Sequence, residues 1–213
     1  MKIMVITSIE PIKDKKMLKI FIDNVYAFSM PQSEYSKNPL QENQEITEEE
    51  IAKIRQNILV RSARESAVRF LLSRDRSEAE VINKLIYKGF DKDVAKDAAQ
   101  ALKAIGYIDD DRFARRYIAE RIRLKSLSKK ALRLELKRKG IADEIIDEAL
   151  SELEIEEEEV AFRAARKKFG KYDIRDEKIQ LKIMRFLCHR GFSIETGKKV
   201  IKYLLGDKEN YYA

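Results

Sequence analysis

The sequence predicts a mainly α-helical protein of three tandem three-helix repeats, with a small N-terminal β-sheet segment. Three observations predict this fold class. No proline interrupts the chain after Pro39, so long helices can form throughout the remainder. A glycine motif recurs at positions 89, 140 and 191, which are 51 residues apart, and such periods are typical of stacked helical units. The segments before residue 31 are rich in β-branched and aromatic residues.

Residues 1–30 are predicted to form a β-hairpin or small antiparallel sheet. The runs KIMVIT, MLKIFID and NVYAFSM have the composition of strands, and Asp23-Asn24 lies between the last two like a hairpin turn. Residues 31–62 are predicted to be a linker followed by a first helix. The linker composition extends over 31–45, and Thr47 with Glu50 forms a capping box that opens the helix.

The repeats are recognised by columns of similar residues around each glycine. Three columns precede the glycine: Val81/Leu132/Ile183 lie eight residues before it, Leu85/Leu136/Leu187 four before and Lys88/Lys139/Arg190 one before. Two columns follow it: Phe90/Ile141/Phe192 lie one residue after and Leu102/Leu153/Leu204 thirteen after. The apolar columns lie on one face of a helix that enters a turn. Each glycine lies where that helix must end, in a position that usually takes a positive φ. The motif therefore predicts a helix-to-helix corner, repeated three times.

One more helix fits before each corner, which gives each repeat three helices. These additional helices are expected at 63–74, 111–124 and 158–170. The predicted repeats are 63–110, 111–156 and 157–206, and a C-terminal tail with Tyr211 and Tyr212 follows at 207–213. Ser77 and Glu80 form a second capping box, and Gly197 predicts a frayed or broken final helix. Stacking of such units predicts an elongated, curved solenoid.

The charge distribution favours an anionic partner. The chain has a formal net charge of +7. Between residues 112 and 139 only Glu120 and Glu135 accompany twelve cations, which are therefore the candidate partner-binding residues. The twelve are Arg112, Arg115, Arg116, Arg121, Arg123, Lys125, Lys129, Lys130, Arg133, Lys137, Arg138 and Lys139. The alternative is a merely solvated helix face. Residues 163–202, with 13 Lys and Arg against 4 acids, are the second choice.

Ten acidic residues, Glu154 among them, follow at 143–159 without any Lys or Arg. This segment predicts either a surface banded by charge or a solvated connector between repeats.

Several classes of function are disfavoured. Cys188 is the only cysteine and His189 the only histidine, so an intrachain disulfide, a thiolate zinc site and a multi-histidine metal site are excluded. No signal-like or membrane-spanning apolar stretch occurs, which indicates a cytoplasmic protein. The run Asp109-Asp110-Asp111 suggests a magnesium-dependent nuclease, but aspartates before a helix are more simply its N-terminal cap. We expect no catalytic residue, metal or cofactor.

Four segments together resemble the RecX family, the small regulators of the bacterial recombinase RecA. They are RSEAEVINKLIYKGF (76–90), GYIDDDRFA (106–114), ELKRKGI (135–141) and RGF (190–192). The resemblance covers nearly the whole chain and is strongest over 64–205. The structural motif residues of this pattern are Arg76, Ser77, Glu80, Gly89, Asp109, Asp110, Gly140 and Gly191. Many members of the family have a glycine in the turn at 125–128, where this chain has none.

The resemblance implies a non-enzymatic monomer that lies in the groove of the RecA filament on DNA. It also implies that the protein restrains strand exchange, ATP hydrolysis and the co-protease activity of the filament, in DNA repair and the SOS response. The alternative is a general nucleic-acid-binding helical protein, since three-helix units can also place a helix in a major groove.

Overall fold

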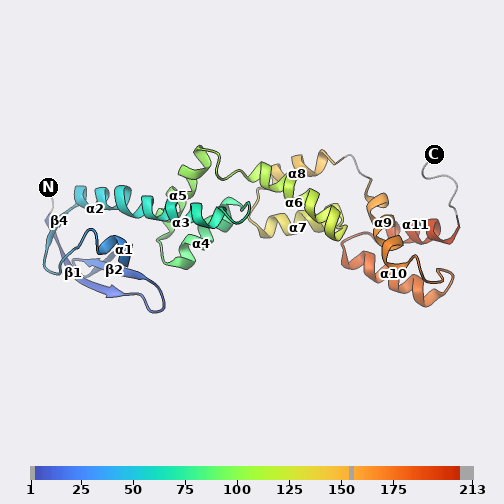
Figure 1. The fold of residues 1–213 in the computed structure, drawn as a ribbon, viewed down its shortest axis with the longest axis horizontal. Coiled ribbons are helices and arrows are strands. Elements are labelled where there is room, and N and C mark those ends of the chain that lie inside the picture. Colours follow the sequence, from blue (N-terminus) through green and yellow to red (C-terminus); the bar gives the residue numbers. More distant parts are fainter. Residues whose placement is uncertain (1–2, 154–155, 207–213) are drawn as a thin grey trace. The chain divides into compact units, whose positions relative to one another are not determined.

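The computed structural model describes residues 3–153 and 156–206 (Figure 1). The chain divides into two compact units at residues 109/110, named here unit 1 (1–109) and unit 2 (110–213). The predicted tail 207–213, with Tyr211 and Tyr212, and Glu154 of the acidic segment lie outside the described residues.

An antiparallel sheet opens unit 1, as the sequence predicts. Its four strands have the order β3-β2-β1-β4. They are β1 (Ile3–Pro11), β2 (Met17–Ile22), β3 (Val25–Pro31) and β4 (Glu45–Thr47). Asp23 and Asn24 form the predicted hairpin turn, with φ of 49° and 65°, values at which Asp and Asn are better tolerated than most residues.

The segment 31–45, predicted to be a linker, is instead part of the fold of unit 1. It contains the short helix α1 (Gln32–Tyr35), and it leads into β4, which pairs with β1. Leu40, inside the segment, and Ile46, directly after it, are 8% and 2% exposed, so both ends of this stretch are anchored in the core. The prediction was wrong because a single buried apolar residue among many polar ones does not alter the composition of a segment.

A continuous helical stretch crosses the predicted boundary at 62/63. It consists of α2 (Glu48–Ile54), the π-helical turn η1 (Arg55–Val60) and α3 (Arg61–Leu71). The capping box of Thr47 and Glu50 begins it, as predicted. The first repeat is completed by α4 (Glu78–Lys88) and α5 (Lys92–Ala104), and the predicted capping box of Ser77 and Glu80 begins α4. Helices α3, α4 and α5 pack against one another (Figure 1).

The sheet and the first repeat share one hydrophobic core. Ile6 and Met30 of the sheet and Leu59, Leu85 and Leu102 of the helices are at most 1% exposed, and all belong to the same cluster. The sheet is therefore an integral layer of unit 1, covered by the helices that follow it.

Unit 2 contains the second and third repeats. Its helices are α6 (Asp110–Lys125), α7 (Lys129–Arg138), α8 (Asp143–Ser151), α9 (Glu157–Phe169), α10 (Glu177–His189) and α11 (Ile194–Leu205). Each repeat has its own cluster of buried side chains, and Ile122 packs against both. The predicted three-helix composition of the repeats is confirmed.

The repeat columns correspond to the core. The residues that lie eight and four positions before each corner glycine are at most 1% exposed. The residue that directly follows each corner glycine is at most 6% exposed. In the column thirteen residues after the glycine, Leu102 is buried, whereas Leu153 and Leu204 are only partly buried. The corner glycines Gly89 and Gly191 have φ of 106° and 86°, and the equivalent glycine of the second repeat has 77°. Positive φ at these corners is thus confirmed.

The corner of the third repeat is also a docking point. A Cβ on Gly191 would overlap the hydroxyl of Ser128 and lie 2.7 Å from the Cβ of Ala131, at the start of α7. The backbone N–H of Ser128 donates a hydrogen bond to the carbonyl of Arg190 at 3.0 Å. In unit 1, a Cβ on Gly89 would similarly lie 2.9 Å from Cγ of Met17. The sequence did not predict this second role of the corner glycines.

The final helix is not broken at Gly197, contrary to the prediction. Helix α11 runs through this residue, which is buried against α10. A Cβ there would overlap the thioether of Met184. The absence of a side chain therefore permits the close packing of α11 on α10, which offsets the low helix propensity of glycine.

Candidate functional site

The twelve cations predicted to bind a partner lie on α6, on α7 and at the C-terminal end of α7. Some of them make ion pairs with the acids of α8. Nε of Arg115 lies 2.8 Å from Oε2 of Glu152, and its Nη2 lies 3.1 Å from Oε1 of Glu148. The hydrogen bond to Glu152 raises the pKa of Arg115, and the same contact lowers the pKa of Glu152.

Helix α7 faces α8 in the same way. Arg133 pairs with Asp147 and, at 3.6 Å, with Asp143, while Nζ of Lys137 lies 2.8 Å from Asp143. Because the helices of this repeat fold back on one another, acids of the segment 143–159 lie opposite the basic stretch. These acids therefore neutralise part of the basic stretch instead of forming a separate band.

Two further predicted cations stabilise the packing of α6 on α7. Nε of Arg121 lies 2.9 Å from Glu135, and its guanidinium lies 4.7 Å from the ring centroid of Tyr117. The hydroxyl of Tyr117 donates to the same Glu135 at 2.6 Å. Nζ of Lys139 lies 5.3 Å from the Tyr117 centroid. These contacts have the geometry of cation–π interactions inside the repeat.

The other predicted cations are exposed. They are Arg112, Arg116, Arg123, Lys125, Lys129, Lys130 and Arg138. Within the part of the chain that the structure describes, the last five of these make no ion pair with an acid. Cations of this kind are available to an anionic partner.

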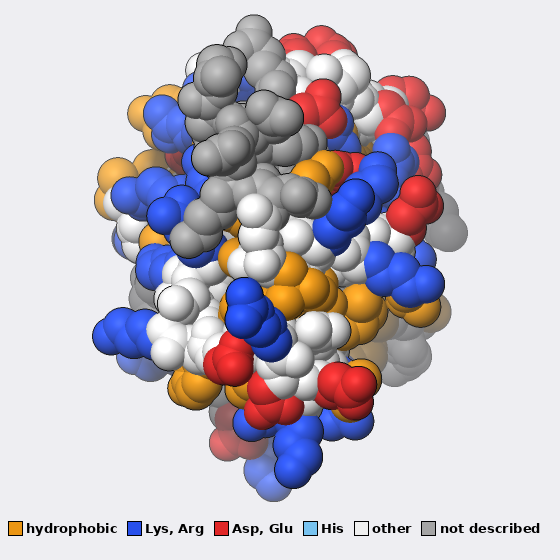
Figure 2. Space-filling view, turned by 90° about the vertical axis from the view of Figure 1, so that its right-hand side faces the viewer, with side chains coloured by type: hydrophobic (Ala, Val, Ile, Leu, Met, Phe, Trp, Pro, Cys, Tyr) orange, Lys and Arg blue, Asp and Glu red, His pale blue; other side chains and the backbone are white. Residues whose placement is uncertain are grey.

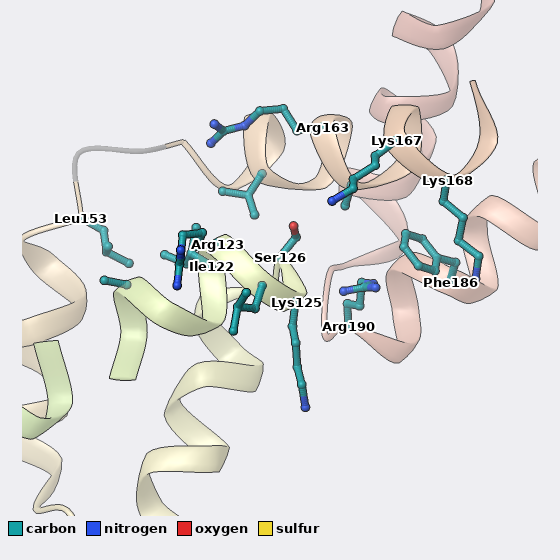
Figure 3. Close-up of a pocket in the computed structure, with 14 residues that line it drawn as sticks. Ile122, Arg123, Lys125, Ser126, Leu153, Arg163, Lys167, Lys168, Phe186 and Arg190 are labelled. Carbon is teal, nitrogen blue, oxygen red and sulfur yellow. The ribbon is translucent and has the colours of Figure 1, made fainter. Parts of the chain in front are cut away.

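Arg123 and Lys125 line a cleft in unit 2, between the C-terminal end of α6 and helices α9 and α10 (Figure 3). Its volume is about 810 Å³. Four more cations line it, and no Asp or Glu among the described residues does so. These four are Arg163, Lys167, Lys168 and Arg190. The apolar side chains of the cleft include Ile122, Leu153, Val160 and Phe186. We refer to this feature as the basic cleft.

The cations of the basic cleft are poorly compensated. Arg163 pairs with Glu159 at 3.5 Å, but the other five make no ion pair within the described residues. Arg190 and Lys168 both lie beside Phe186, at 4.2 Å and 4.4 Å from its ring centroid. Burial lowers the pKa of Arg190. A partly desolvated guanidinium without a carboxylate is unfavourable by itself, so an incoming anion would be stabilised there.

A second hollow extends this basic surface along α10. It shares Lys125, Lys168 and Arg190 with the basic cleft and adds Lys182 and Arg185; its acidic lining residue is Glu135. Figure 2 shows that, on the side of the molecule that it views, Lys and Arg side chains are interspersed with hydrophobic side chains and with Asp and Glu.

A tight turn connects α6 to the docking point and sets this geometry. Helix α6 ends at Lys125, and Ser126 then takes a φ of 49°. The turn at 125–128 contains no glycine, although glycine adopts this left-handed conformation at less cost than serine does. The hydroxyl of Ser128 accepts a hydrogen bond from the N–H of Ala131 at 3.1 Å and caps α7. The backbone of Ser128 binds that of Arg190, so the ends of α6 and α10 meet at the basic cleft.

The remaining motif residues have structural roles in the described contacts. The guanidinium of Arg76 lies 4.1 Å from the ring centroid of Phe70 and donates to the hydroxyl of Ser73 at 3.2 Å. Asp110, which is 7% exposed, is the first residue of α6, and Asp109 directly precedes it. Carboxylates are favoured at this end of a helix.

His189 and Cys188 lie exposed on α10. Among the described residues, no three or more His, Cys, Asp and Glu side chains are grouped as metal ligands. None of the described helices combines the length and the hydropathy that a membrane span requires.

Sequence reasoning predicted two of the six cations of the basic cleft, Arg123 and Lys125. It did not single out the other four, Arg163, Lys167, Lys168 and Arg190, as binding residues, although it ranked the basic segment 163–202 second. The signal that could have identified Arg190 is its column, since each corner glycine follows a Lys or Arg.

Comparisons with known proteins agree with the repeat structure. Models of the first, second and third three-helix domains of RecX match residues 63–102, 109–150 and 156–201. The regulatory protein RecX of Clostridium beijerinckii is 32% identical over 197 residues, which cover 91% of this chain and 92% of that protein. That of Clostridium tetani is 31% identical over 209 residues, or 96% of each chain.

Two crystal structures share the fold. One, of a regulatory protein RecX, has a TM-score of 0.61 and 24% identity, and covers 93% of this chain and 99% of its own. The other, of RecX from Lactobacillus salivarius, has a TM-score of 0.57 and 23% identity, and covers 68% of this chain and 96% of its own.

Proposed function

Because this chain belongs to the RecX family of regulatory proteins, we propose that it is a non-enzymatic regulator that binds in the groove of RecA–DNA filaments. It acts as a cytoplasmic monomer in DNA repair and the SOS response, and inhibits the recombinase, ATPase and co-protease activities of the filament. The observation that supports this proposal most directly is the basic cleft of unit 2, lined by six cations and by no described carboxylate.

The composition of the cleft suits a filament groove. Its cations can bind DNA phosphates or the carboxylates of a groove wall, and its apolar floor can contact protein side chains. The adjoining hollow along α10 extends the same chemistry. Several weak contacts held on one scaffold reinforce each other through effective concentration, and contacts with neighbouring subunits would oppose both strand entry and subunit exchange.

The deciding experiment follows ATP turnover while the purified protein is titrated into RecA, ATP and single-stranded DNA at two DNA concentrations. A filament regulator inhibits at amounts near or below those of RecA, and a second portion of DNA does not restore turnover. A general nucleic-acid-binding protein competes for free DNA instead, so added DNA abolishes its effect. That second result would replace the proposal with the alternative function.

Paired variants test whether the basic cleft forms the interface. We expect Lys167→Gln with Lys168→Gln to raise the concentration needed for inhibition. If both side chains bind phosphates of the single-stranded DNA, the slope of log affinity against log salt falls in magnitude by about 0.7 for each phosphate that is no longer neutralised.

The matched control is Lys92→Gln with Lys96→Gln. It removes the same charge from exposed residues of α5 that line neither the cleft nor the adjoining hollow and lie outside both basic segments of the sequence. Equal effects of the two double variants would mean that overall charge, and not the cleft, determines binding. Circular dichroism should show unchanged helicity in both.

A further inference from the structure

A second basic hollow lies within unit 1, between the β1–β2 turn and helices α3 and α4. Its volume is about 700 Å³. Five cations line it, three from the turn, one from α3 and one from α4, with Asp14 as the acidic lining residue. They are Lys13, Lys15, Lys16, Arg69 and Lys88. Ser33, Ser62 and Ser66 add hydroxyl groups. We refer to this hollow as the hairpin cleft.

The cations of the hairpin cleft have no acidic partner among the residues that the structure describes. Within the described part of the chain, none of the five makes an ion pair, although the cleft contains Asp14. This contrasts with neighbouring cations of the same unit, such as Arg61, which pairs with Glu34 at 2.9 Å, and Lys103, which pairs with Glu78 at 2.7 Å. The positive charge of the cleft is therefore left uncompensated by the fold.

Lys88 is the most confined of these cations. It is the last residue of α4, and its Nζ donates to the hydroxyl of Ser66, a residue only 4% exposed, at 2.6 Å. Burial lowers the pKa of Lys88, and the charges of Arg69 and Lys84 lower it further. The carbonyl end of α4 favours a cation in its last turn. That effect accounts for Lys88 alone and not for the lysines of the turn.

The hairpin cleft repeats the design of the basic cleft. Lys88 precedes Gly89 as Arg190 precedes Gly191, and burial lowers the pKa of both cations. Each corner is docked on the preceding part of its own unit, since a Cβ on Gly89 would lie 3.3 Å from Cδ of Lys15. In both places a lysine close to the docking point lines the cleft, Lys15 in unit 1 and Lys125 in unit 2.

We propose that the hairpin cleft binds a phosphate group. Five cations and three hydroxyl groups supply more donors than a carboxylate accepts, and a guanidinium with hydroxyl donors suits the oxygens of a phosphate. The phosphate belongs either to a nucleic-acid backbone or to a small phosphorylated molecule. The site is separate from the basic cleft and does not depend on the function proposed for it.

The test uses the full chain carrying Lys167→Gln and Lys168→Gln, so that binding at the basic cleft is weakened. Inorganic pyrophosphate is titrated by calorimetry, and a fluorescein-labelled oligothymidylate of about ten nucleotides by anisotropy. Lys88→Gln and, separately, Arg69→Gln are compared with Lys96→Gln, an exposed lysine of α5 outside the cleft. Each variant changes the charge by the same amount.

We expect saturable binding that Lys88→Gln weakens about tenfold or more, since a charge-assisted hydrogen bond is removed. Arg69→Gln weakens it in the same direction, and Lys96→Gln leaves it nearly unchanged. If Lys88→Gln and Arg69→Gln weaken the binding of pyrophosphate, the ligand is a small phosphorylated molecule. If they weaken the binding of the oligonucleotide alone, the ligand is a backbone phosphate. The proposal is overturned if neither probe binds, or if Lys88→Gln and Arg69→Gln bind both probes as tightly as Lys96→Gln does.

Discussion

Because the corner of the third repeat docks on α7, we expect two similar glycine substitutions to lower the free energy of unfolding by different amounts. Gly191 and Gly106 both have positive φ, at 86° and 75°. A Cβ on Gly106 would meet nothing within 4 Å, whereas a Cβ on Gly191 would overlap the hydroxyl of Ser128 and lie 2.7 Å from the Cβ of Ala131. Gly191→Ala thus tests the docking, and Gly106→Ala is its control for backbone strain.

The expected losses of unfolding free energy in the two variants differ enough to be measured. A left-handed alanine costs about 1 kcal/mol relative to glycine at either position. At Gly191 the added methyl must also be inserted into a closed contact, for about 1–3 kcal/mol. Ser128 is fully buried, and its N–H bonds to Arg190 in the same contact, so the contact has little freedom to relax. We expect Gly191→Ala to lower the free energy of unfolding by about 3 kcal/mol, roughly 2 kcal/mol more than Gly106→Ala.

Urea unfolding followed by circular dichroism measures both variants, and hydrogen exchange with mass spectrometry locates the effect. In Gly191→Ala, peptides that span the start of α7 should lose protection, while peptides of unit 1 should not change. Equal free energies for the two variants, with protection of α7 retained, would refute the reasoning that the corner docks on Ser128.

Two further predictions concern stability. Ser77→Ala removes the hydroxyl that caps α4, so the free energy of unfolding of unit 1 should fall by about 1 kcal/mol in urea titrations; an unchanged midpoint would show that the capping box is dispensable. Because Arg115 lowers the pKa of Glu152, this carboxylate stabilises the fold above its unfolded pKa of about 4.3, and the contribution is lost as pH falls through the folded pKa. Arg115→Gln should therefore lower the thermal midpoint near neutral pH and reduce its decline in acid; parallel profiles for the two proteins would contradict this coupling.

The buried faces were predictable because a helix repeats its side-chain directions. Val81, Leu132 and Ile183 occur at one offset from the corner glycines and are fully buried. Leu40 and Ile46 were not predictable, since each is an isolated apolar residue in a polar segment and becomes an anchor only when β4 pairs with β1.

The charged site was less predictable than the core because charge is compensated through tertiary contacts. The sequence shows that Arg133 and Arg123 belong to one basic stretch. It does not show that Arg133 on α7 pairs with Asp147 on α8, whereas Arg123 lines a cleft. Arg190 joins that cleft only because its corner docks on the start of α7, which is far from it along the chain.

The shared side chain of Ile122 and the backbone bond from Ser128 to Arg190 also decide where the chain can be divided for experiments. A fragment that stops between the second and third repeats would expose the part of Ile122 that packs on the third repeat and leave the Ser128 amide without its acceptor, so we expect it to aggregate. A cut between Asp109 and Asp110 follows the natural division of the molecule. Dissection should therefore treat the two C-terminal repeats as one inseparable piece.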